Sequence, residues 1–131
     1  MVLFPVILAA LAFSFEFGRL FIAHHTTVNN VRAAVRYLSR SDLTAAQQDT
    51  ARAIVRTGQP SGATAPDWMT GANITITPSQ STFSDTDFRT GGQVIRIQAE
   101  VNFPLSLFGF INDGRTGVPI TIVEDIRHIG D

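Results

Sequence analysis

The sequence contains no cysteine and no lysine, and only 16% of its 131 residues are charged. Without cysteine, disulfides, thiolate metal sites and a cysteine nucleophile are excluded. Its ten basic residues, all arginine, nearly balance eleven acidic ones. A net charge of −1 disfavours nucleic acid as a ligand, because phosphate binding needs a clustered basic excess. No catalytic constellation and no phosphate-binding glycine loop is evident, so we expect neither an enzyme nor a cofactor.

What the sequence does contain is a long apolar run at its start. Residues 1–23 carry no polar side chain except Ser14, Glu16 and Arg19. At about 1.5 Å per residue, a helix needs this whole stretch to cross the ~30 Å hydrocarbon layer of a bilayer. We therefore predict a membrane segment at about residues 1–23. A cleaved secretory signal fits less well, because no cationic segment precedes the apolar run.

Two charges interrupt this run. Glu16 and Arg19 lie three residues apart, on one face of a helix, inside or near the membrane. They either pair, within one helix or across two, or hydrate at the headgroup level. Pro5 is tolerated in a first helical turn, where its missing N–H has no intrahelical acceptor. Gly18 costs about 1 kcal/mol relative to alanine and indicates a close helix contact or a soft point.

Residues 24–40 predict an amphipathic continuation of the same helix. An apolar stripe at three- and four-residue spacing consists of Val28, Val31, Val35 and Leu38. A second stripe at four-residue spacing consists of Arg32, Arg36 and Arg40. These arginines face either solvent or carboxylates on a neighbouring subunit. We expect residues 1–40 to form one hydrophobic stalk about 60 Å long, with the first 25 to 40 residues contributing little to the core of the domain that follows.

Residues 41–131 predict a small globular domain, which makes the chain α+β. Thr44 and Gln47 form a capping box for a short helix over about residues 44–57, and Gly58 ends it. Trp68, the single tryptophan, is expected to pack into the core.

Beyond residue 73 the hydrophobic period changes to two. This pattern predicts a small antiparallel sheet with strands at about 73–78, 93–103 and 118–129. The connections at 80–92 and 104–117 are too apolar for free linkers. They either form a patch that a partner covers or pack over the open end of the sheet. Their acidic residues lack the spacing of a calcium loop, so we expect no metal site.

Two stretches, EFGR at residues 16–19 and VRAAVRY at residues 31–37, make the sequence resemble TadE-like pseudopilins of the tight-adherence branch of type IV pili. Such proteins share an apolar start with an early proline, a helix rich in alanine and arginine, and a strand-rich C-terminal part. The resemblance covers the first sixty residues, and the sheet by pattern only. It implies a pilin-like structural subunit held in the bacterial inner membrane, which the pilus assembly machinery transfers into a homo-oligomeric helical filament at the cell surface.

Under this resemblance the N-terminal helices mediate subunit assembly. The residues expected to do so are Pro5, Glu16, Phe17, Gly18, Arg19, Val28, Val31, Arg32, Val35, Arg36 and Leu38.

The sequence departs from the family at its start. Family members carry a short leader ending in glycine, which a prepilin peptidase removes, and a glutamate soon after the cut. Here the apolar run begins at Met1 and Glu16 is the first glutamate, so either a leader was removed or processing differs. Arginines after the run would by charge alone place the domain in the cytoplasm; the resemblance favours the outside.

A second hypothesis is a membrane-anchored periplasmic binding or adaptor module that does not polymerise. A mere anchor needs no apolar spacing as far as Leu38, so we take this continuation as favouring the filament subunit.

Overall fold

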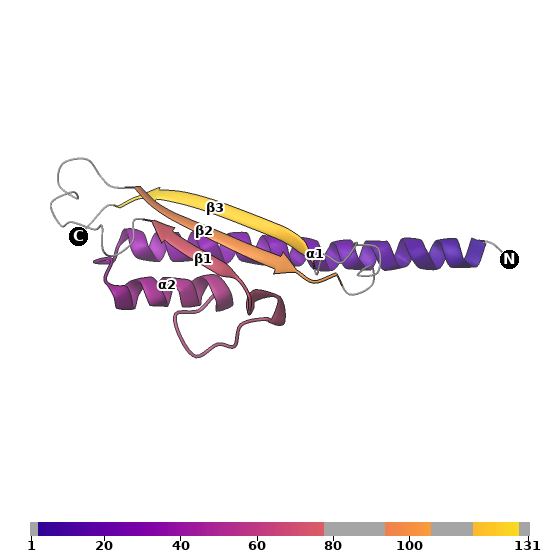
Figure 1. The fold of residues 1–131 in the computed structure, drawn as a ribbon, viewed down its shortest axis with the longest axis horizontal. Coiled ribbons are helices and arrows are strands. Elements are labelled where there is room, and N and C mark those ends of the chain that lie inside the picture. Colours follow the sequence, from indigo (N-terminus) through magenta and orange to yellow (C-terminus); the bar gives the residue numbers. More distant parts are fainter. Residues whose placement is uncertain (1–2, 78–93, 106–116, 129–131) are drawn as a thin grey trace.

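The computed structural model describes residues 3–77, 94–105 and 117–128 (Figure 1). In chain order its elements are helix α1 (Leu3–Ser39), helix α2 (Ala45–Thr57), the 3-10 turn η1 (Asp67–Met69) and strands β1 (Asn73–Thr77), β2 (Val94–Phe103) and β3 (Val118–Arg127). The predicted α+β class, with a long N-terminal helix, a short second helix and a small antiparallel sheet in a pilin-like layout, is confirmed.

Helix α1 is continuous over 37 residues, about 55 Å at the usual rise. Pro5 lies in its first turn, where it removes no helical hydrogen bond. In Figure 1 the second half of α1 lies along the sheet and α2, and its first turns extend past the ends of β2 and β3.

Helix α2 begins and ends where its sequence predicts. The Gln47 side-chain oxygen accepts a hydrogen bond from the Thr44 backbone N–H at 3.0 Å, which completes the capping box. Gly58 ends the helix with a φ of 77°, a left-handed conformation that glycine adopts without strain. The helix packs antiparallel against α1, and the Asn30 amide donates to the Val55 carbonyl at 3.2 Å.

The sheet has the order β1-β2-β3, and both strand pairs are antiparallel. The register places Ile76 beside Ile97, and Phe103 beside Val118. One face is apolar and packs on α1, and the other face is exposed, as the alternation predicts. The predicted strands agree with those observed, except that β3 ends at Arg127 and His128 is not part of it; residues 78, 93 and 129 lie outside the described part of the chain.

The core includes the second half of α1, so the expectation that the stalk contributes little to it is wrong. The buried residues in this half of α1 are Ala23, Thr27, Val31, Ala34, Val35, Leu38 and Ser39. A three-stranded sheet has one apolar face that must be covered, and α1 covers it. Trp68 packs partly buried against this core, its ring 6.3 Å from that of Phe103, as expected.

Candidate membrane and assembly surface

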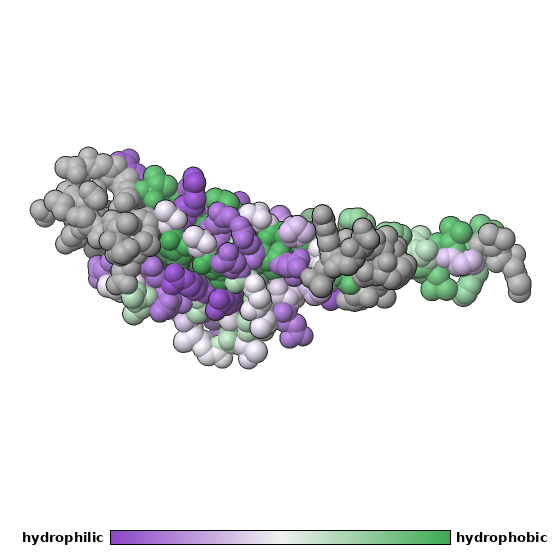
Figure 2. All heavy atoms as spheres, in the orientation of Figure 1, coloured by the Kyte–Doolittle hydropathy of each residue, from purple (hydrophilic) through white to green (hydrophobic). Residues whose placement is uncertain are grey.

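The most prominent functional feature is an exposed apolar surface on residues 3–22, which we call the apolar half of α1 (Figure 2). Its large hydrophobic side chains that are at least 47% exposed are Leu3, Phe4, Val6, Ile7, Leu8, Leu11, Phe13, Phe15, Phe17, Phe21 and Ile22. They cover more of the helix surface than a single stripe would, and only the side that holds Glu16 and Leu20 is turned toward the rest of the chain. Such a surface is typical of a helix that lies in lipid or among other helices.

By length and composition α1 is able to cross a membrane. An N-terminal apolar helix of this kind indicates a membrane anchor or a signal sequence.

Glu16 and Arg19 form a pair within this one helix. Glu16 is only 3% exposed, and its Oε2 atom lies 3.7 Å from Nη1 of Arg19. The Arg19 guanidinium in turn lies over the ring of Phe103, 5.5 Å from its centroid. The two charges left unassigned by the sequence therefore join α1 to the end of β2.

Other residues expected to mediate assembly lie on the surface. Pro5, Phe17 and Gly18 are exposed, and a side chain added at Gly18 would meet no described atom within 4 Å. No contact among the described residues therefore requires glycine at position 18. These three residues are accessible to lipid or to another protein.

The apolar stripe of residues 28–38 lies elsewhere than expected. Val31, Val35 and Leu38 are buried in the chain's own core, and Val28 packs partly buried against it. These side chains are covered by the sheet and α2, so they offer no surface to another subunit in this conformation. The inference that only a filament subunit needs an apolar stripe as far as Leu38 is therefore wrong.

One arginine of the second stripe forms an ion pair inside the chain. Nε of Arg32 lies 2.9 Å from Oε1 of Glu124 on β3. This contact explains why Glu124 interrupts the apolar alternation of that strand. Arg36 and Arg40 are exposed, and no acidic residue of the described chain is within ion-pair distance of either.

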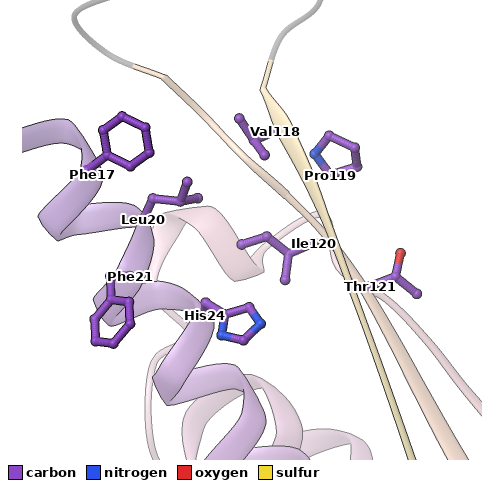
Figure 3. Close-up of a pocket in the computed structure, with 8 residues that line it drawn as sticks. All are labelled: Phe17, Leu20, Phe21, His24, Val118, Pro119, Ile120 and Thr121. Carbon is purple, nitrogen blue, oxygen red and sulfur yellow. The ribbon is translucent and has the colours of Figure 1, made fainter. Parts of the chain in front are cut away.

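An open apolar groove of about 560 Å³ lies between α1 and the start of β3 (Figure 3). It is lined by Phe17, Leu20, Phe21, His24, Val118, Pro119, Ile120 and Thr121. In Figure 3 the side chains of Leu20 and His24 point toward Ile120 across the open space. No local sequence pattern indicates this groove, because β3 and residue 17 are far apart in the chain; Pro119 by itself indicates only an edge strand or a strand start.

Nothing in the described chain points to a metal site: residues 3–77, 94–105 and 117–128 contain no group of three or more His, Asp or Glu placed to hold an ion. The predictions for the connection at 80–92, and for 106–116 of the second one, lie outside the described residues. His128 lies with its Nε2 atom 3.0 Å from the Ser41 carbonyl oxygen, a contact that ties the end of the sheet to the end of α1.

Comparisons of the chain with protein-family models, with curated proteins and with solved structures find no match. Function is therefore inferred from the geometry described above.

Proposed function

We propose that this chain is a structural subunit of a type IV pilus-like filament, of the TadE-like kind. The apolar half of α1 holds it in the bacterial inner membrane before assembly and packs among the same helices of other subunits afterwards. The observation that carries the proposal is the division of α1: residues 3–22 expose apolar side chains, while the following residues are built into the core. The domain is thus rigidly joined to an unpaired apolar helix.

The energetics favour removal of this helix from water. Covering one large apolar side chain contributes about 1.5–3 kcal/mol. For the exposed side chains of residues 3–22 together, the gain is on the order of 15–30 kcal/mol. A bilayer supplies this gain before assembly and a bundle of the same helices supplies it afterwards. Because lipid and a helix bundle are both apolar, transfer from one to the other changes this contribution little.

The test is electron microscopy of material sheared from cells that express the full chain. Because the sequence has no cysteine, Val123→Cys on the exposed face of β3 can be labelled specifically with biotin and gold. We expect gold along filaments, and none with the unsubstituted chain under the same labelling. Recovery of the labelled protein only in inner-membrane fractions, with no labelled filaments, would overturn the filament proposal.

One observation favours the second function, a membrane-anchored module that does not polymerise. The side chains of Val31, Val35 and Leu38 are buried inside the chain. An anchor made of residues 3–22 alone would therefore account for the apolar surface of α1 that remains exposed. The same fractionation separates the two functions, because this module stays in the membrane as a monomer or dimer.

A further inference from the structure

One end of the sheet lies beside the apolar half of α1. We call this end the domain tip; it holds Phe103, Leu105, Val118 and Pro119. Arg19 covers the Phe103 ring at 5.5 Å, and Val118 and Pro119 share the groove with Phe17 and Phe21 (Figure 3). Phe17 and Phe21 are 65% and 72% exposed. Whatever covers these two phenylalanines therefore also reaches the domain tip.

The sheet changes in polarity along its length. In the four residue pairs of β2 and β3 nearest the tip, from Phe103↔Val118 to Glu100↔Thr121, the only charged residue is Glu100. In the four pairs at the far end, from Ile97↔Glu124 to Val94↔Arg127, four residues are charged. The sheet therefore has an apolar end, at the tip, and a charged end.

Helix α1 changes in polarity at the same level. After Arg19 the next titratable residue of α1 is His24, which is exposed. His24 lines the groove together with Thr121, and Thr121 pairs with Glu100, the first charged residue of the sheet counted from the tip. Helix α1 and the sheet, which are far apart in the sequence, thus change from apolar to polar at the same level. A planar boundary between lipid and water would produce such a match.

The Glu16–Arg19 pair lies on the apolar side of this level without contradicting it. Glu16 is buried, and Arg19 is paired with it and stacked on Phe103. Pairing and protein cover reduce the cost of placing both charges at the edge of a membrane. The aliphatic stem and length of arginine also let its charged group reach toward headgroups.

We propose that the domain tip is inserted in the interfacial layer of the bilayer that holds α1, with lipid filling the groove between α1 and β3. A bilayer fits better than a second copy of α1, because the exposed apolar surface continues around the helix to Ile22 instead of ending at the groove. Interfacial segments are buried by about 5–10 Å, and Pro119 and Val123 are separated by about 13 Å along β3 at 3.3 Å per residue. The inference rests on membrane anchoring by α1 but not on polymerisation.

The experiment measures depth along β3 in the full chain. Single cysteines at Pro119, Thr121 and Val123 all lie on its exposed face, and the sequence has no other cysteine. Each variant is labelled with an environment-sensitive fluorophore and reconstituted at low density in phosphatidylcholine–phosphatidylglycerol vesicles. Lipids with a spin label near the headgroup serve as quenchers. We expect quenching to fall several-fold from position 119 to position 123, with position 121 between them and emission shifted to the blue at 119.

The outcomes separate this inference from the proposed function. Equal, weak quenching at all three positions in protein that floats with the vesicles would overturn tip insertion and leave membrane anchoring intact. Shielding at position 119 that grows with protein density, without lipid quenching, would assign the groove to a second copy and also overturn it. Protein that does not float with vesicles would overturn the anchoring and the inference together. If Pro119→Cys misfolds, the contrast between Thr121→Cys and Val123→Cys decides.

Discussion

The two halves of α1 are one continuous helix, yet they differ in what surrounds them. Residues 3–22 expose large apolar side chains over most of the helix surface, whereas most apolar side chains of residues 23–38 lie on one face and are buried or partly buried against the sheet and α2. Backbone geometry is the same in both halves, so the difference arises from side-chain pattern alone. A helix that is apolar all round needs an apolar solvent or many neighbours, and one with a single apolar face needs only its own domain.

This comparison also shows why the domain is small. Three strands and a 13-residue helix provide little core, and the second half of α1 completes it. Cutting the chain near residue 40 would therefore remove part of the core together with the apolar half of α1. The boundary between the apolar half and the part of α1 built into the core lies inside a helix, near Ala23, and not at a loop.

The largest expected effect comes from making the same substitution, leucine to alanine, once in each half of α1. Leu38 is fully buried, so Leu38→Ala should lower the free energy of unfolding by about 3–5 kcal/mol, through lost burial and the cavity left behind. Leu11 is 63% exposed, and Leu11→Ala should change it by less than about 0.5 kcal/mol. Denaturant unfolding in detergent micelles, followed by Trp68 fluorescence, measures both. Similar losses at the two positions would mean that both halves belong to one core.

Much of this division was predictable from local pattern. The capping box at Thr44 and Gln47, the stop at Gly58 and the period-two strands each depend on neighbours within a few residues, and each was predicted correctly. The start of the membrane-compatible segment was equally plain, because no charge precedes Glu16.

The partners of the helix faces were not predictable in the same way. An apolar stripe at Val31, Val35 and Leu38 shows that a face is buried, but not whether the cover comes from the same chain or another one. The contact of Arg19 with Phe103 and the pair of Arg32 with Glu124 join residues more than eighty positions apart. Glu124 within an apolar strand face is a local signal for the second of these contacts, but the strand pattern alone does not identify Arg32 as its partner.

The second prediction places a charge in the apolar half. Leu8 is exposed and far from the domain, so Leu8→Arg should leave the fold unchanged while lowering membrane insertion by about 2.5–3.5 kcal/mol, on the order of a hundredfold. The vesicle partition coefficient of the full chain, from flotation over a series of lipid concentrations, measures insertion, and circular dichroism checks the fold. Leu8→Ala is the matched control and should partition far more strongly than Leu8→Arg. Equal partition coefficients for the two variants would argue that residues 3–22 are not in the membrane.

The third prediction compares two glycines, Gly117 at the domain tip and Gly18 in the apolar half of α1. A Cβ at Gly117 would lie 2.4 Å from the Phe103 carbonyl oxygen, so Gly117→Ala must shift the backbone at the domain tip. Such overpacking costs about 1–3 kcal/mol. Gly18→Ala meets no described atom within 4 Å and should instead stabilise the chain by about 0.5–1 kcal/mol, through helix propensity. Thermal unfolding of the two variants should therefore shift in opposite directions; shifts of the same sign would contradict the packing described at Gly117.

The fourth prediction compares two acid–arginine pairs with the same three-residue spacing. Glu16 pairs with Arg19 at a buried site, and Asp49 pairs with Arg52 at 2.8 Å on the surface of α2. Glu16→Gln should lower the free energy of unfolding by about 1–2 kcal/mol, because it removes the charge that balances Arg19 beside the domain tip. Asp49→Asn should lower it by at most a few tenths of a kcal/mol. Equal effects in unfolding experiments would show that burial does not strengthen the first pair; a filament yield that falls only for Glu16→Gln would extend its role to assembly.

The smallest effect is expected at the charged end of the sheet. Both guanidinium nitrogens Nε and Nη2 of Arg96 donate to the Asp125 carboxylate at 2.7 Å, and this hydrogen-bonded pair lowers the pKa of Asp125 below its ordinary value. A lowered pKa in the folded state stabilises the fold above the ordinary value near 3.8, and this contribution is lost as the pH falls through the lower, folded value. Asp125→Asn should therefore unfold slightly more easily than the unsubstituted chain at pH 6. The two should converge as the pH is lowered from about 4 toward 2, and 1 M salt should also reduce the difference, because both side chains are largely exposed. A difference in unfolding temperature that persists unchanged at low pH would assign it to packing on β3 instead of the ion pair.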